Sequence, residues 1–186
     1  MTESTADIAA RLADDLDGTF PDLVRMLQDD VFGGALRMTG DRTDAEDVAQ
    51  ETFVRAYRAL SGYPAARIRD LRVRGWVWTI ALNLCRNRAR SRSRKPVASL
   101  PEGLDPPSAA PGPEEEALAA DTAGDLAGHL AALPWEQRRA VVLRHVVGLG
   151  YAEIAEAADR PVGTVKADVH RGLARLREAV PREEHR

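Results

Sequence analysis

Hydrophobic residues recur three or four positions apart through most of the chain, which is the spacing of one face of an α-helix. In the segment 20–40 the residues at this spacing are Leu23, Met26, Leu27, Val31 and Leu36. Gly40 follows them and predicts the end of that helix. No segment shows the sustained apolar–polar alternation of a strand, so the pattern predicts an all-α fold.

A second helix is predicted from Thr43, because Glu46 stands three residues further on and the pair fits a capping box. The stretch "SGYPAARIRD", residues 61–70, interrupts the pattern and predicts a loop. A third helix follows and runs into alternating arginines at 86–94. Its apolar stripe consists of Val73, Val77, Ile80, Ala81 and Leu84.

The segment 96–113 differs in composition, with six of the eleven prolines and no basic residue. Such a sequence buries too little apolar surface to offset the entropy of ordering it, so we expect a flexible linker. The linker separates an N-terminal domain at 19–95, preceded by an extension at 1–18, from a C-terminal domain at 114–186. We therefore expect two small helical domains, the first of them a helical bundle.

The C-terminal domain has the layout of a helix-turn-helix. Helical patterns at 114–133 and 134–148 are followed by a short helix that turns Ile154 inward, a turn at 159–163 and a longer helix from Thr164. The longer helix is apolar on one side and polar on the other, and its polar face comprises Lys166, Ala167, His170 and Arg171. Such side chains can bind base edges in the major groove, and Thr164 is predicted as the N-cap, beside amides that could hold a phosphate.

The helix "WVWTIALNLCRNRARSRSRK", residues 76–95, has a second polar edge. Helical winding gathers Trp76, Asn83, Asn87 and Arg90 along it. An aromatic ring can stack on an unpaired base, amides can read base edges, and guanidinium groups can hold phosphates. This edge therefore suits an opened nucleic-acid strand.

Charge is segregated along the chain although the formal net charge is only −3. Residues 64–95 hold ten basic residues and one acidic residue, whereas residues 1–63 hold six basic and thirteen acidic residues. Clustered Lys and Arg attract phosphate, so the middle segment is predicted to bind a polyanion.

Other function classes find little support. The single Cys85 cannot supply a disulfide or a cysteine-rich zinc site, and the four histidines have neither metal-ligand nor catalytic-triad spacing. No phosphate loop or serine nucleophile motif is present, so we expect neither an enzyme nor a bound metal or cofactor. No apolar run could span a bilayer and the N-terminus lacks signal-peptide features, so we expect a cytoplasmic protein without membrane insertion.

Three separated motifs resemble the extracytoplasmic-function branch of bacterial RNA polymerase sigma factors. They are "TDAEDVAQETFVRAYRAL", "RGWVWTIALNLCRNRARSRSRK" and "ALPWEQRRAVVLRHVVGLGYAEIAEAADRPVGTVKADVHRGLARLR". The resemblance covers about residues 20–180 and implies two helical domains, sigma domain 2 and sigma domain 4, that direct core RNA polymerase to promoter DNA. It also implies contacts with the largest and second-largest polymerase subunits, and control by an anti-sigma factor.

The resemblance also assigns roles to residues. It places Asp47, Gln50, Glu51 and Phe53 on the clamp helices of the largest polymerase subunit. It places Trp76, Asn83 and Asn87, with the loop around Ser61–Arg72, on the melted minus-ten strand, and winding adds Arg90 to that edge. It places Lys166, Ala167, His170 and Arg171 on the minus-thirty-five duplex, and the predicted N-cap adds Thr164.

Two residues depart from the family pattern. Asp168 lies in the reading helix, where a carboxylate near phosphates is unfavourable, and we expect it to pair with Arg171 or Arg175. Gly172 should weaken the same helix by up to about 1 kcal/mol relative to Ala.

The alternative function is a helix-turn-helix regulator that acts without core polymerase, which would leave the N-terminal domain unexplained.

Overall fold

A computed structural model describes residues 5–94 and 126–179, with side chains for 7–91 and 126–179. Every regular element in these ranges is helical, which confirms the predicted all-α class for the part of the chain described. The labelled helices are α1 (Thr5–Asp14), α2 (Leu16–Thr39), α3 (Arg42–Ser61), α4 (Ala65–Arg69), α5 (Val73–Arg94), α7 (Trp135–His145), α8 (Tyr151–Ala158) and α9 (Val162–Ala179). Residues 126–132 are also helical, within the helix predicted at 114–133. The predicted linker at 96–113 lies outside the described residues.

The boundary between α2 and α3 is set by two adjacent residues. Gly40 adopts a left-handed φ of 68° and ends α2, as the sequence predicted. The predicted cap at Thr43 is wrong, because α3 begins one residue before it and Asp41 is the N-cap. The Asp41 carboxylate accepts a hydrogen bond of 2.8 Å from the backbone N–H of Asp44. Asp41 is therefore the residue that fixes where α3 starts.

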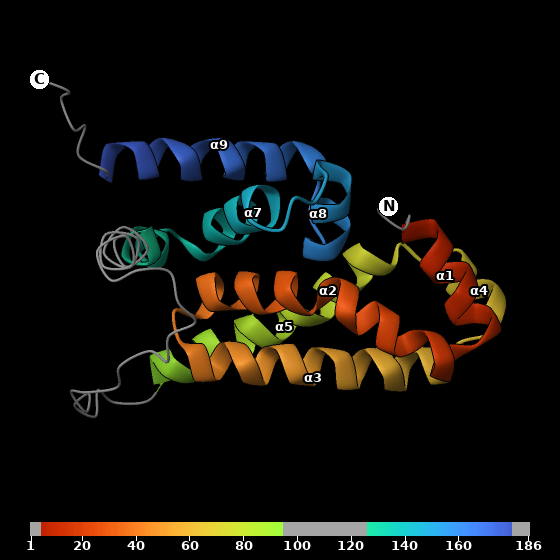
Figure 1. The fold of residues 1–186 in the computed structure, drawn as a ribbon. Helices are drawn as coiled ribbons and strands as arrows, with labels where there is room; N and C mark the ends of the chain where they lie inside the picture. Colours follow the sequence, from red (N-terminus) through yellow and green to blue (C-terminus); the bar gives the residue numbers. More distant parts are fainter. Residues whose placement is uncertain (1–4, 95–125, 180–186) are drawn as a thin grey trace, which may run out of the picture.

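Two segments without a predicted helix are helical. Residues 5–14 form α1, and the expected domain boundary at residue 19 falls inside α2. The predicted loop at 61–70 contains the short helix α4. Figure 1 shows α1 and α4 side by side at one end of the N-terminal bundle, and the two helices pack against each other. The N-terminal extension is thus part of the bundle.

Helix α5 is buried along two stripes. The predicted stripe is confirmed at Val73, Val77, Ala81 and Leu84, and Ile80 is partly buried. A second stripe, which the winding did not single out, consists of Trp78, Leu82 and Cys85. Helix α5 packs against α2 and α3 and also against α8, so it lies between the two regions of the chain.

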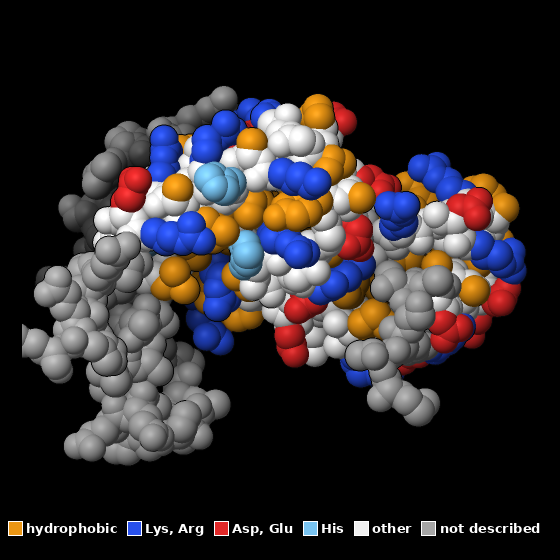
Figure 2. Space-filling view, turned by 90° about the horizontal axis from the view of Figure 1, so that it is seen from above, with side chains coloured by type: hydrophobic (Ala, Val, Ile, Leu, Met, Phe, Trp, Pro, Cys, Tyr) orange, Lys and Arg blue, Asp and Glu red, His pale blue; other side chains and the backbone are white. Residues whose placement is uncertain are grey.

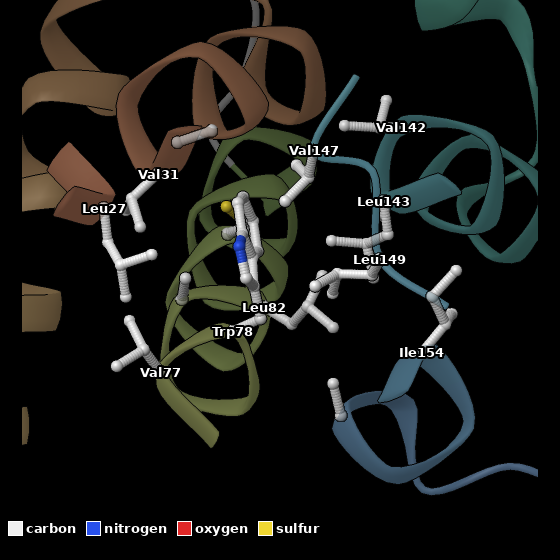
Figure 3. Close-up of a cluster of buried hydrophobic side chains, with 14 of the residues drawn as sticks. Leu27, Val31, Val77, Trp78, Leu82, Val142, Leu143, Val147, Leu149 and Ile154 are labelled. Atoms are coloured by element: carbon white, nitrogen blue, oxygen red, sulfur yellow. The ribbon is translucent and has the colours of Figure 1, made fainter. Parts of the chain in front are cut away.

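The two regions share one hydrophobic core. In Figure 3 the Trp78 side chain lies between Val31 of α2 and Val147, in the segment that links α7 and α8. The Trp78 side chain is 0% exposed. Arg74 of α5 donates to the Val147 carbonyl and pairs with Asp30 of α2 at 2.9 Å. The described parts of the two expected domains therefore pack together, because α5 has apolar surface on both sides to bury.

The C-terminal helices confirm the helix-turn-helix layout. Helix α8 ends at Asp159, whose left-handed φ of 50° redirects the chain toward α9. Helix α9 packs across α7 and α8, and Figure 1 shows it at the top of the molecule, farthest from α3. Among the described residues, no helix is both long and apolar enough to cross a bilayer.

Candidate nucleic-acid and polymerase interfaces

The predicted reading face of α9 is exposed. Lys166, His170 and Arg171 are exposed and Ala167 is half-buried, while Val165 and Val169 on the opposite side are buried. Figure 2 looks down on this side of the molecule and shows Lys, Arg and His side chains gathered over it. The Lys166 ammonium also lies 5.6 Å from the centre of the Tyr151 ring, so α8 supports it from below.

Asp168 is turned inward, away from the reading face. It is 5% exposed, and one carboxylate oxygen lies 2.7 Å from a guanidinium nitrogen of Arg171. Its other oxygen lies 4.0 Å from Arg160, just before α9. Pairing with Arg171 was one of the two predicted outcomes. The carboxylate thus holds Arg171 in place on the face instead of repelling phosphates.

Gly172 is buried where α9 crosses α7. A Cβ at this position would lie 2.6 Å from Cγ2 of Val141 and 3.3 Å from the Gln137 carbonyl oxygen. Gly172 therefore allows the two helices to approach closely, which is a reason for a glycine in the middle of a helix. The sequence showed only its cost in helix propensity.

The predicted N-cap at Thr164 is wrong. Helix α9 begins at Val162, and the Val165 backbone N–H donates to the Pro161 carbonyl at 3.1 Å. Thr164 consequently lies in the first helical turn and is half-buried. Its hydroxyl still stands at the N-terminal end of the reading face, where the amides of the first turn favour an anion.

The predicted edge of α5 is present, and a second aromatic residue supports it. Asn83, Asn87 and Arg90 are exposed, while Trp76 is half-buried. The Trp76 ring centre lies 6.1 Å from that of Tyr63, in the segment that joins α3 to α5. The guanidinium of Arg67 lies over the Tyr63 ring, 3.7 Å from its centre. These three side chains form a continuous aromatic and cationic surface beside α4.

The C-terminal region borders the same edge of α5. A hollow beside Asn83 is lined by α5 and by C-terminal residues that include Trp135, Arg139 and Asp159. Asn87 lies beside a different hollow, between α3 and α5. The two asparagines therefore share a helix edge but have different neighbours.

The predicted residues of α3 line the hollow next to Asn87. Asp47 and Gln50 are exposed, and Glu51 is half-buried. Arg88 of α5 reaches across to Asp47 at 3.0 Å and to Asp44 at 3.2 Å. Glu51 accepts from Arg55 at 2.7 Å, and this hydrogen bond lowers the pKa of the Glu51 carboxyl. The face thus presents acidic groups that are already partly paired.

Two family models match the two regions of the chain. The model for Sigma-70 region 2 matches residues 23–95, and that for Sigma-70, region 4 matches residues 126–176. The chain is 33% identical over 169 residues to the ECF RNA polymerase sigma factor SigW of Bacillus subtilis, covering 86% of this chain and 87% of SigW. The chain belongs to the ECF sigma factor family.

Other similarities agree with this assignment. The chain is 37% identical to the ECF RNA polymerase sigma factor SigE of Mycolicibacterium smegmatis, over 86% of this chain but only 61% of SigE. CnrH, solved in complex with the cytosolic domain of CnrY, matches with a TM-score of 0.71 at 25% identity, covering 95% of this chain and 96% of CnrH. RpoE of Bartonella quintana matches with a TM-score of 0.67 at 20% identity, covering 89% and 98%.

Phe53 of this sigma factor does not lie on the same surface as Asp47 and Gln50. Its ring is 8% exposed and belongs mainly to the core, because its helical position turns it toward α2. The small exposed part of Phe53 lines a separate apolar hollow, which shares Val54 with the hollow beside Asp47 and Gln50. A direct partner contact by Phe53 is limited to that hollow.

The sequence prediction missed the residues around this apolar hollow. Val54 and Tyr57 of α3 are 42% and 38% exposed, and Phe20 of α2 packs edge-on to the Tyr57 ring with centres 5.1 Å apart. The Tyr57 hydroxyl donates to Asp17 at 2.7 Å, which raises the pKa of Tyr57. Val54 follows Asp47 and Gln50 by seven and four residues, so helical winding places it on their side of α3. That spacing was the available signal.

Proposed function

We propose that this sigma factor binds core RNA polymerase through α3 and reads promoter DNA at two places, with α9 on minus-thirty-five duplex and the α5 edge on the melted minus-ten strand. The observation that supports this best is the separation of surfaces within one chain of this family. The reading face of α9 is exposed and basic, whereas the hollow beside α3 is lined by Asp47, Gln50 and Glu51 together with Arg55 and Arg88. Such an arrangement suits a protein that joins a DNA site to a protein partner.

The polymerase-binding surface is proposed to combine charge with apolar area. Asp47, Gln50 and Glu51 supply polar groups for the clamp helices of the largest subunit. Val54 and Tyr57 supply exposed apolar surface next to them, and such surface is typical of the centre of an interface. The second-largest subunit is proposed to contact the C-terminal region. Binding would require Asp47 to exchange its pairing with Arg88 for pairing across the interface.

The reading face of α9 is proposed to lie in the major groove. Lys166 and His170 can donate to base acceptors, and Ala167 can contact a thymine methyl. Arg171, oriented by the buried Asp168, can donate to a phosphate or a guanine without first being ordered. Thr164 would contact the backbone at the N-terminal end of the helix.

The α5 edge is proposed to bind bases only after strand separation. Stacking needs a free face of a base, and amides read Watson–Crick edges that duplex DNA does not expose. Trp76 would offer its exposed part for stacking, Asn83 and Asn87 would read base edges, and Arg90 would hold the backbone. Asn83→Ala should then impair promoter opening, measured by permanganate reactivity of unpaired thymines, more than it impairs binding to core polymerase.

The direct test is run-off transcription with purified core polymerase, with and without this protein, from promoters selected out of a randomised library. We expect specific transcripts only when the protein is present, and failure to obtain any would contradict the proposal. Asp47→Arg should abolish the gain by preventing polymerase binding. Equal activity of this variant would favour the alternative, a regulator that acts without core polymerase, which the match to Sigma-70 region 2 does not favour.

An anti-sigma factor is proposed as a further partner, acting with the sigma factor in the cytoplasm. RpoE of Bartonella quintana, which shares this fold, was solved in complex with the anti-sigma factor NepR. Co-purification from the source bacterium, followed by a run-off assay with the captured protein added, would test this. An inhibitor of the run-off reaction is expected.

A further inference from the structure

Helix α1 packs into the N-terminal bundle through a buried apolar face. Its residues Ile8, Ala9 and Leu12 are 0%, 0% and 1% exposed. Among the other helices, α1 packs against α4, α2 and α5. It lies before both segments that the family models match, which begin at residues 23 and 126. None of the residues proposed above to bind DNA or polymerase lies in α1.

Helix α4 is part of the segment that joins α3 to α5, and it anchors this segment to the core through Ile68. Its residue Ile68 is 4% exposed and belongs to the same hydrophobic cluster as Ile8 and Leu12. On the outer side, Arg67 lies over the Tyr63 ring, and Tyr63 in turn contacts Trp76. A shift of α4 would therefore move Arg67 and Tyr63 relative to Trp76.

Polar contacts hold the last turn of α1 against α4 and α2. Asp14 at the end of α1 pairs with Arg69 of α4, and Arg11 pairs with Asp22 of α2. The Thr19 hydroxyl also donates to the Arg11 carbonyl at 3.2 Å. Exposed ion pairs contribute little to stability, but together with the buried apolar face they define one position of α1 relative to α4.

We propose that α1 is a positioning element for minus-ten strand capture, with Ile8 and Leu12 as positioning residues that hold α4 and thereby the surface formed by Tyr63, Arg67 and Trp76. This inference rests on the proposed function. A stacking site formed in advance does not have to be ordered when the base arrives, so its selectivity depends on how firmly it is held. Weakening the packing of α1 should therefore reduce the preference among minus-ten bases, in addition to any loss of activity.

The experiment uses the full chain, core polymerase and a promoter library randomised at both the minus-ten and minus-thirty-five elements. The variant is Leu12→Ala, which removes a buried side chain from the helix that packs on α4. We expect preference among minus-ten bases to fall by about tenfold, since misplacement by about 1 Å can cost that much or more. Preference at minus-thirty-five, read from the same transcripts, should be unchanged.

Met38→Ala is the matched control. Met38 is 1% exposed and lies at the opposite end of α2 from α1. The variant therefore removes a comparable buried side chain from the same bundle. We expect it to lower thermal stability without changing minus-ten preference. Leu12→Met, which conserves volume, should restore the preference. If Leu12→Ala and Met38→Ala lower activity alike and both retain full minus-ten preference, α1 is only structural and the proposal is overturned.

A milder variant keeps the test decisive if Leu12→Ala does not fold. Ile8→Val removes one methylene from the same face, and Asp14→Asn removes the charge that pairs with Arg69. We expect each to reduce minus-ten preference by about twofold to threefold, corresponding to the smaller change in packing or charge. Unchanged preference in both would overturn the proposal. Absence of transcripts with the wild-type chain would instead overturn the proposed function.

Discussion

The two surfaces proposed to bind DNA differ in what surrounds them. The reading face of α9 is open, and its support comes from α7 and α8 within the same region. The edge of α5 is bordered by Trp135 and Arg139 of the other region, and its Trp76 is half-buried. The surface proposed for duplex DNA is therefore exposed in the isolated chain. The surface proposed for a melted strand is bordered by both regions and depends on how they are arranged.

This difference follows from the position of α5. A helix at the edge of a fold buries one stripe, as α9 does with Val165 and Val169. Helix α5 lies between two regions and buries two stripes, which leaves its polar residues on the remaining side. A change in the contact between the regions should therefore alter the surroundings of Asn83 more than those of Lys166.

The largest expected effect comes from breaking that contact at Trp78. Trp78→Ala removes a fully buried ring that touches both regions, so we expect a loss of about 3–5 kcal/mol in the free energy of unfolding. Chemical denaturation followed by circular dichroism measures it. The control is Trp76→Ala, two residues away and half-buried, which should lose much less stability. Equal losses would mean that the two regions do not share a core in solution.

The contrast between Trp76 and Trp78 also shows what the sequence could and could not predict. Helical winding identified the first apolar stripe of α5, because its partners α2 and α3 lie in the same region. The second stripe was present at 78, 82 and 85 with equally regular spacing. It was not recognised because its partner comes after the linker, and a single sequence does not show that two distant regions pack together.

The candidate site was likewise predicted only in part. The exposed residues of α9 were found from the face they share, since winding fixes which side chains point outward. Phe53 was carried over from the family although it is largely buried, and Asp168 was not recognised as an inward residue. Burial of Asp168 depends on Arg160 and Arg171 being near enough to compensate its charge, which only the folded structure shows.

The next effect is expected where α9 packs against α7 at Gly172. Gly172→Ala would place a methyl group 2.6 Å from Val141, so α9 must move away from α7. We expect a loss of about 1–3 kcal/mol in stability and weaker binding to minus-thirty-five duplex. Gly163→Ala is the control, because a Cβ there meets no atom within 4 Å and should be neutral or slightly stabilising. A stable Gly172→Ala variant with full duplex affinity would contradict the close packing described.

On the open face of α9 itself we expect an effect on binding alone. Lys166→Ala should weaken binding to minus-thirty-five duplex by about 1–3 kcal/mol if Lys166 contacts a base, with little change in stability because the side chain is exposed. Fluorescence anisotropy with labelled duplex, in the presence of core polymerase, measures it. Arg177→Ala, an exposed cation in the last turn of the same helix, is the control. A similar loss for both variants at every sequence would indicate general attraction to phosphate instead.

The smallest expected effect tests the second stripe of α5 through its thiol. Burial raises the pKa of Cys85 from an ordinary 9.0 to about 12. A raised folded-state pKa means that this contribution is complete below pH 9 and is lost as the pH rises toward 12, because only the unfolded chain then releases the proton. Between pH 8 and pH 9.5 the wild type should lose about 1 kcal/mol more stability than Cys85→Ala, which has no thiol. Denaturant unfolding of both proteins at the two pH values gives the difference. Equal pH dependence, or rapid reaction of native Cys85 with a thiol reagent at pH 8, would contradict the burial of this thiol.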